Sequence, residues 1–207
     1  MIEGYFKKRK RILERISQFR SMKKAGPKKL FEELAFCILT PQSKALLCHQ
    51  AILELKKRGL LFGGSEEEIA KVLKGKVRFH NNKAKFLVAA RELFRKDKFK
   101  SLKEITFMQN NKKAREKLVE KVKGIGLKEA THYLRNVGRG KGLAILDRHI
   151  LKNLFLHKVI KEVPKNLTKS RYIKIEKRMA SFCKKNRIPI EHADLLFWAK
   201  ETGFIFK

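Results

Sequence analysis

A turn of two glycines around one apolar residue constrains this chain more than any other short segment. Gly124, Ile125 and Gly126 form the turn. An apolar run ends before it at Val122, and apolar residues recur at helical spacing from Leu127 onwards. Because glycine has no Cβ, its backbone can approach another molecule closely. The first N–H groups of a helix lack partners within it and lie at its positive dipole end. The segment therefore predicts two helices joined by a hairpin, with a seat for a phosphate group.

Two residues with reactive side chains follow the hairpin. Lys128 lies in the first turn of the second helix, and Asp147 stands where the next helix begins. An unprotonated amine can attack the anomeric carbon of a nucleotide, and a carboxylate can stabilise positive charge that develops on the sugar. The structural alternatives are a surface lysine in a basic chain and an N-cap, which contributes about 1 kcal/mol. A lysine and then an aspartate after a phosphate seat indicate chemistry on DNA.

The segment from Val122 to Asp147 resembles the helix-hairpin-helix motif of the DNA glycosylase superfamily, which includes endonuclease III and the 8-oxoguanine glycosylases. The resemblance implies that Lys128 and Asp147 are catalytic. It also implies an all-α fold of two helical lobes with a DNA-binding cleft between them. Residues 30–137 are then the central lobe with the hairpin, and residues 1–29 and 138–207 are the second lobe. The glycine-rich loop 138–142 lacks the proline that many members carry, which bears on the stiffness of the loop.

The charge of the chain agrees with a nucleic-acid partner. Of 207 residues, 52 are Lys or Arg and 20 are Asp or Glu, which gives a formal net charge of +32. Such an imbalance favours binding to a polyanion. A ribosomal protein is one alternative. The Lys-rich surface of a thermophilic protein is another, but it predicts a matching number of acidic residues. We expect double-stranded DNA as the partner of a monomeric protein.

The cysteines indicate an intracellular protein. Three cysteines are widely spaced and form no Cys-x-x-Cys pair, which fits reduced thiols in the cytoplasm or nucleoid. Cys37 lies in an apolar run, so we expect it to be buried and inert. The four-cysteine iron–sulfur cluster of endonuclease III is absent, and we expect no cofactor and no metal ion. No signal peptide or membrane span is recognisable, so we expect no membrane partner.

Helical spacing of apolar residues runs through the chain, and sustained alternation is missing, which predicts helices and no sheet. Thr40 and Pro41 predict the N-cap and first position of a fresh helix. Two segments, Ser65–Glu68 and Ser101–Glu104, fit the capping box, in which a serine and a glutamate satisfy the first N–H groups of a helix.

The stretch from Ile38 to Ser43 resembles the superfamily segment Leu-Ser-x-Gln, whose glutamine fills the space left by a flipped base. The resemblance implies this role for Gln42, with Pro41 beside it in contact with the substrate. A polar side chain at a helix start can satisfy the unpaired edges that base extrusion leaves behind. The alternative is that Gln42 is an ordinary residue of a first helical turn.

The stretch from Arg78 to Ala84 resembles the superfamily segment that wedges a residue opposite the damaged base. The resemblance implies that Phe79 and His80 contact DNA, since an apolar side chain can insert between base pairs. The alternative is that Phe79 belongs to the core beside a helix start.

The end of the chain resembles the second 8-oxoguanine glycosylase family of archaea and some bacteria, which consists of small enzymes without an iron–sulfur cluster. In that family the C-terminal residue helps to recognise the oxidised base, which implies this role for Lys207. Trp198 is the candidate stacking face, and Asp194 lies one turn earlier on the same helix face. Alternatively, Trp198 is a core residue and the tail is frayed. The apolar run 204–206 favours a tail packed on the last helix.

These features predict a bifunctional enzyme that excises 8-oxoguanine and then cleaves the abasic site by β-elimination through a Schiff base on Lys128. Two alternatives stay open: an endonuclease III-like glycosylase for oxidised pyrimidines, and a non-catalytic helix-hairpin-helix protein that binds DNA. The non-catalytic protein needs the glycines but neither Lys128 nor Asp147. The missing cluster and the C-terminal residues favour the oxidised purine.

Overall fold

The computed structural model describes residues 2–206, with side chains described from residue 4 onwards, and this part of the chain is helical without a strand. The prediction of an all-α protein is confirmed. The chain divides into two compact units. One unit joins the two ends of the chain, Met1–Lys23 and Leu134–Lys207, and the other is the continuous segment Lys24–Tyr133. The sequence places these divisions near residues 30 and 138.

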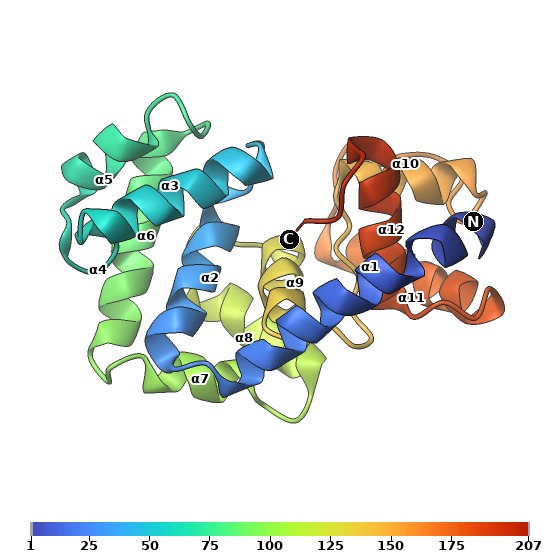
Figure 1. The fold of residues 1–207 in the computed structure, drawn as a ribbon, viewed down its shortest axis with the longest axis horizontal. Helices are drawn as coiled ribbons and strands as arrows, with labels where there is room; N and C mark the ends of the chain where they lie inside the picture. The colour runs from blue at the N-terminus through green and yellow to red at the C-terminus, as the bar shows by residue number, and fades with distance from the viewer. Residues whose placement is uncertain (1, 207) are drawn as a thin grey trace. The chain divides into compact units, whose positions relative to one another are not determined.

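The continuous unit is assembled around one helix that is buried on most of its sides. Its helices are α2 (Pro27–Leu39), α3 (Ala45–Lys57), α4 (Leu60–Gly63), α5 (Glu66–Leu73), α6 (His80–Arg95), α7 (Lys100–Thr106), α8 (Asn111–Lys121) and the first turns of α9 (Leu127–Asn136). Helix α2 packs against α3, α6 and α7 (Figure 1). Every residue from Leu34 to Leu39 is buried. A helix that is apolar all round is stable only when other elements cover it, as they do here.

The unit formed by the two chain ends also has a central helix. Its elements are α1 (Ile2–Ser21), the short 3₁₀ helix η1 (Met22–Lys24) at its edge, the end of α9, α10 (Arg148–Leu156), α11 (Lys169–Lys185) and α12 (Ile190–Thr202). Helix α12 packs against α1, α10 and α11 (Figure 1). The Tyr5 hydroxyl lies 2.9 Å from Nδ1 of His192 in the buried interior and links α1 to α12. These contacts hold the N-terminal helix in the C-terminal half of the chain.

One predicted capping box is present and the other is wrong. The Ser65 box closes the start of α5 with both of its hydrogen bonds. At the second box, α7 begins two residues earlier than predicted and Phe99, not Ser101, takes the N-cap position. The Ser101 N–H group donates to the Asp97 carboxylate at 2.9 Å, so aspartate replaces serine as the acceptor. The reason is packing, since Phe99 is buried and its ring centroid lies 5.0 Å from that of Phe31.

The three cysteines are buried thiols, as expected for Cys37. Burial raises the pKa of Cys48 to about 11 and that of Cys183 to about 12, because an apolar interior disfavours the thiolate. Between residues 2 and 206, none of the helices combines the length and the apolar character that crossing a membrane requires.

Candidate active site

The predicted hairpin joins α8 to α9, and the presence of glycine has a different explanation at each of its two glycine positions. Gly124 has a φ of +84°, and a Cβ on it would lie 2.3 Å from the Phe86 ring, so the fold itself requires glycine there. A Cβ on Gly126 would meet the Glu129 carboxylate at 3.5 Å, which is an ordinary contact. Gly126 is exposed. The fold tolerates a side chain at this position, so the glycine fits a place where another molecule approaches the backbone.

The middle residue of the hairpin, Ile125, anchors the turn, whereas the Gly126 N–H group is not open as predicted. Ile125 is buried, which fixes the turn to the core of its unit. The Gly126 N–H group, predicted to be open for a phosphate, donates to Oε2 of Glu129 at 3.1 Å. Glu129 therefore acts as an acceptor at the start of α9, and the hairpin is closed by its own side chain in this structure.

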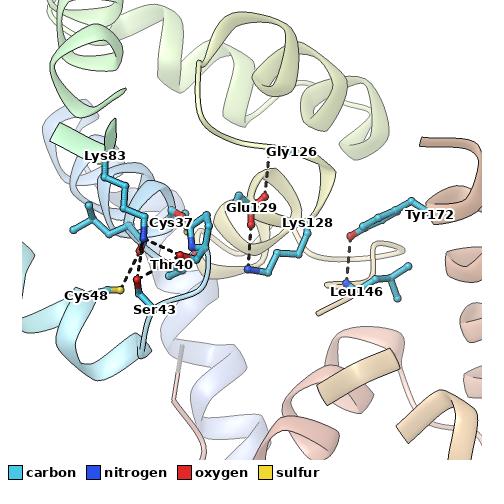
Figure 2. A network of polar contacts seen from close by, with 12 residues as sticks. Cys37, Thr40, Ser43, Cys48, Lys83, Gly126, Lys128, Glu129, Leu146 and Tyr172 are labelled. Carbon is cyan, nitrogen blue, oxygen red and sulfur yellow. Dashed lines mark hydrogen bonds and ion pairs between the residues drawn. The ribbon is translucent and has the colours of Figure 1, made fainter. Parts of the chain in front are cut away.

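Lys128 lies in the first turn of α9 with its ammonium group paired to the neighbouring residue. Its Nζ is 3.1 Å from Oε1 of Glu129, and the two side chains are 24% and 13% exposed. One carboxylate thus holds both the hairpin N–H group and the candidate nucleophile (Figure 2). The amine is partly withdrawn from water and kept at the surface of its unit, which suits a group that must meet an external substrate.

Asp147 is the N-cap of α10, as the sequence predicts. Its Oδ1 accepts hydrogen bonds from the N–H groups of His149 at 2.8 Å and Ile150 at 2.9 Å. Its backbone is extended, with φ −88° and ψ 178°. Both capping bonds end on the same oxygen, so the cap fixes the direction of the carboxylate while Oδ2 takes no part in it. The structural and catalytic interpretations of Asp147 are compatible.

The segment before Asp147 is fixed by helix α11. The Tyr172 hydroxyl donates to the Ala144 carbonyl. It also accepts the Leu146 N–H group at 3.4 Å (Figure 2). The buried Glu176 carboxylate accepts the Ala144 N–H group at 2.9 Å. These two side chains fix residues 144–146, which lie between the glycine-rich loop 138–142 and Asp147. The sequence does not predict either contact, because nothing in the local pattern links α11 to a segment some thirty residues earlier.

The prediction that Thr40 and Pro41 begin a helix is wrong. Thr40 ends α2 instead, and its hydroxyl donates to the Cys37 carbonyl at 2.8 Å. Pro41 and Gln42 form a turn, and α3 begins at Ala45. Gln42 is exposed and has a φ of +53°, a conformation that is uncommon for a residue with a side chain. Gln42 is therefore a turn residue that projects from its unit, and the interpretation as a first-turn helix residue is also wrong.

Phe79 is on the surface, so the interpretation as a core residue is wrong. Its side chain is 51% exposed, and its φ is +57°. The Arg78 guanidinium lies over the ring, 5.4 Å from its centroid. His80 is half-buried and opens α6. An exposed aromatic ring in a strained turn is an unusual feature of a folded surface, and it fits a residue that inserts into a partner.

Asp194 is buried and paired with a buried arginine. Its Oδ2 lies 3.0 Å from a guanidinium nitrogen of Arg135, and both side chains are almost inaccessible. Burial raises the pKa of Asp194 to about 6, Arg135 opposes this rise, and the negative charge of Asp147 adds to it. The negative charge of Asp147 therefore acts on Asp194, a link that the sequence does not predict.

The C-terminal tail packs on α12 and α1 up to the last described residue. Phe204 meets the half-buried Trp198 edge to face, with ring centroids 5.2 Å apart. The Arg15 side chain of α1 donates to the Phe206 carbonyl at 3.1 Å. The predicted packing on the last helix is present at Phe204, although its side chain is 37% exposed, and Phe206 is held by α1 instead. Lys207 lies outside the described residues.

The comparisons with known proteins agree with one another. Residues 12–188 match the family model described as 8-oxoguanine DNA glycosylase. The chain is 46% identical to an 8-oxoguanine DNA glycosylase/AP lyase of Fusobacterium nucleatum, with 94% of this chain and 90% of the relative aligned. It is 36% identical to the protein of the same name from Methanocaldococcus jannaschii, with coverages of 95% and 91%.

The solved structures give the same result. A Methanocaldococcus jannaschii 8-oxoguanine glycosylase/lyase, in complex with a 15mer DNA containing 8-oxoguanine, superposes with a TM-score of 0.88 at 34% identity, covering 100% of this chain and 99% of that one. The 8-oxoguanine DNA glycosylase of Thermotoga maritima gives 0.87 at 32% identity, with coverages of 98% and 94%. The chain belongs to the 8-oxoguanine DNA glycosylase family.

Proposed function

We propose that this chain excises 8-oxoguanine from double-stranded DNA and cleaves the resulting abasic site, with Lys128 as the nucleophile. The observation that carries the proposal is the position of Lys128 in the first turn after the hairpin, in a chain of this family. The names of the relatives favour this activity over excision of oxidised pyrimidines and over binding without catalysis. The protein acts as a monomer inside the cell.

The chemistry needs one amine and one carboxylate. The unprotonated amine of Lys128 attacks the anomeric carbon, and the glycosidic bond breaks as the base departs with the bonding electrons. Asp147 stabilises the positive charge on the sugar and assists the transfer of the proton that the amine loses. The opened sugar forms a Schiff base with Lys128. Loss of a proton from the neighbouring carbon then expels the 3′ phosphate, and water releases the lysine.

The remaining predicted residues form a group that binds DNA and a group that binds the substrate base. Gly124, Ile125 and Gly126 place the hairpin backbone against a phosphate, and Phe79 and His80 contact the duplex. The substrate-binding group consists of Gln42, Pro41, Trp198 and Lys207. Asp194, which the family resemblance placed with them, is buried against Arg135 and therefore does not belong to this group. The exposure of the Gln42 and Phe79 side chains supports their assignment, because a residue that enters the duplex must project from its unit.

An oligonucleotide panel tests the function. Duplexes carrying 8-oxoguanine, thymine glycol or uracil are incubated with the protein, and base release and strand cleavage are measured separately. We expect excision of 8-oxoguanine at least one hundred times faster than that of either pyrimidine. Preferred release of thymine glycol would replace the proposed substrate, and binding without release of any base would leave only a DNA-binding protein.

The C-terminal residue provides a test of base recognition. 8-Oxoguanine carries a hydrogen on nitrogen 7 where guanine has a lone pair, so a fixed acceptor discriminates the two bases. Deleting Lys207, or adding a few residues after it, should slow 8-oxoguanine excision at least tenfold while cleavage of a ready-made abasic site stays within twofold. Unchanged excision by the extended chain would move base recognition away from the tail.

A further inference from the structure

Lys83 is a buried cation whose charge is satisfied by neutral oxygens. Its side chain is 3% exposed, and its ammonium group donates three hydrogen bonds (Figure 2). The acceptors are the Leu39 carbonyl at 2.7 Å, the Pro41 carbonyl at 2.8 Å and the Ser43 hydroxyl at 2.9 Å. An ammonium group has three donors, so this set uses all of them. Burial is the main reason that the pKa of Lys83 is lowered to about 8, and the nearby positive charge of Lys128 contributes to this lowering.

The three acceptors all belong to the turn that carries Gln42. Leu39 is the last residue of α2, and Pro41 and Ser43 flank Gln42 on either side. The carbonyls at a helix end have no partners within the helix, so an outside donor must satisfy them. A single buried ammonium group reaches across from α6 and fixes this turn at three points. Gln42 is held between two of those points with its side chain outward.

The same hydroxyl links this turn to the second strained segment. The Ser43 Oγ atom also accepts the Arg78 N–H group at 3.0 Å. Arg78 directly precedes Phe79, whose φ of +57° resembles the +53° of Gln42. The buried Lys83 ammonium group and the partly exposed Ser43 hydroxyl thus link two turns, and each turn presents one exposed side chain at a residue with a positive φ. A residue with a side chain keeps a positive φ only where surrounding contacts hold its backbone in place, and the hydrogen bonds of Lys83 and Ser43 are such contacts.

We propose that Lys83 is a positioning residue that fixes, through Ser43, the two turns from which Gln42 and Phe79 enter the DNA duplex. The inference rests on the proposed function, because it assigns Lys83 to base extrusion in that reaction. A simpler role is a cap for the C-terminal end of α2, where a cation is favourable. The two roles differ in their consequences. A cap affects folding and therefore every activity equally, whereas a positioning residue affects only steps that require entry into a duplex.

The test compares Lys83→Met with Lys85→Met, an exposed position on the same helix that loses the same charge. Single-turnover excision of 8-oxoguanine from a duplex should fall at least tenfold in Lys83→Met. Borohydride trapping on a single-stranded oligonucleotide with a ready-made abasic site should stay within twofold, because no duplex has to be opened. Lys85→Met should match the wild type in both assays. Equal losses in both assays, or no loss in either, would overturn the proposal.

Two further variants keep the test decisive. If Lys83→Met does not fold, Ser43→Ala removes the shared hydroxyl from a partly exposed turn, and it should show the same separation of the two assays with a smaller loss. In a Gln42→Ala, Phe79→Ala background, Lys83→Met should add less than a twofold loss, because Lys83 acts through those residues. Additive losses would contradict the inference. Failure of the wild type on the 8-oxoguanine duplex would refute the proposed function instead.

Discussion

Lys128 and Asp147 both lie at the N-terminal ends of helices. The helix dipole stabilises a negative charge at this end and destabilises a positive one. Asp147 caps α10 with two hydrogen bonds, and its negative charge is favourable beside the positive end of the helix dipole. Lys128 places an ammonium group in the first turn of α9, where the dipole disfavours it by about 0.3–1 kcal/mol. The fold alone explains the aspartate. The position of Lys128 lowers the stability of the fold, so its presence there requires a chemical explanation.

Glu129 reduces the cost of that placement. Its carboxylate accepts the Gly126 N–H group and pairs with the Lys128 ammonium group, so it acts as a helix-start acid and as a counter-charge. Substitutions at four residues test the contrast between the two helix starts.

The largest effect is expected for Lys128→Gln. The substitution removes the nucleophile, so borohydride should trap no covalent adduct with DNA containing 8-oxoguanine. It also removes a cation from a helix start, so the free energy of unfolding in urea should stay equal or rise by up to about 1 kcal/mol. Lys113→Gln, an exposed position in α8, is the matched control and should form the adduct normally. Wild-type trapping by Lys128→Gln would move the nucleophile to another lysine.

Asp147→Asn should lower the rate of base excision by roughly one hundred to one thousand times, the usual range for losing a proton-transferring or charge-stabilising carboxylate. Asparagine is also a good N-cap, so the free energy of unfolding should change by less than about 1 kcal/mol. Single-turnover excision and urea denaturation measure the two effects. Asp147→Ala serves as the reference that loses both the cap and the charge. An Asn variant as fast as the wild type would reduce Asp147 to its structural role.

Asp194→Asn should have an effect of intermediate size, on how the free energy of unfolding depends on pH. The pKa of this buried carboxyl rises from 3.8 to about 6, so the folded protein binds the proton more tightly than the unfolded chain. The stability that this proton contributes is complete below pH 3.8 and is lost as the pH rises through about 6. The difference in free energy of unfolding between the wild type and Asp194→Asn should therefore fall by about 3 kcal/mol across that range. Parallel pH profiles of the two proteins would contradict the assignment.

The smallest effect is expected for Glu129→Gln. Glutamine can still accept the Gly126 N–H group, but it no longer provides the negative charge that pairs with the Lys128 ammonium group. The Lys128 side chain is then released from its ion pair and can reach an external substrate more easily, so borohydride trapping should become several times faster than in the wild type. Single-turnover trapping rates of the two proteins under the same conditions test this. Slower trapping by Glu129→Gln would instead make Glu129 the acceptor of the proton that Lys128 loses.

Local patterns predicted most of the fold and the positions of both candidate catalytic residues. Helical spacing, the hairpin glycines, the Ser65 capping box and the Asp147 cap depend on residues close together in the chain. The family resemblance supplied the roles of these residues, and the structure supplied their surroundings.

The errors occurred where distant residues decide a local conformation. Thr40 and Pro41 looked like a helix start, but Lys83 supplies donors to the carbonyls at the end of α2 from far along the chain. Ser101 looked like a cap, but burial of the Phe99 ring sets the chain path before α7. The loop before Asp147 depends in the same way on α11. Sequence periodicity carries no signal for contacts of this kind, because each partner is an ordinary residue of its own helix.

The buried thiols have a consequence for the conditions under which such an enzyme would work. Peroxide oxidises the thiolate form of cysteine, and solvent access limits the rate. At neutral pH a thiol whose pKa is about 11, as for Cys48, is ionised in roughly one molecule in ten thousand. Cys183 is ionised even less. An oxidative burst that creates damaged guanine would therefore oxidise the sulfur atoms of Cys48 and Cys183 only slowly.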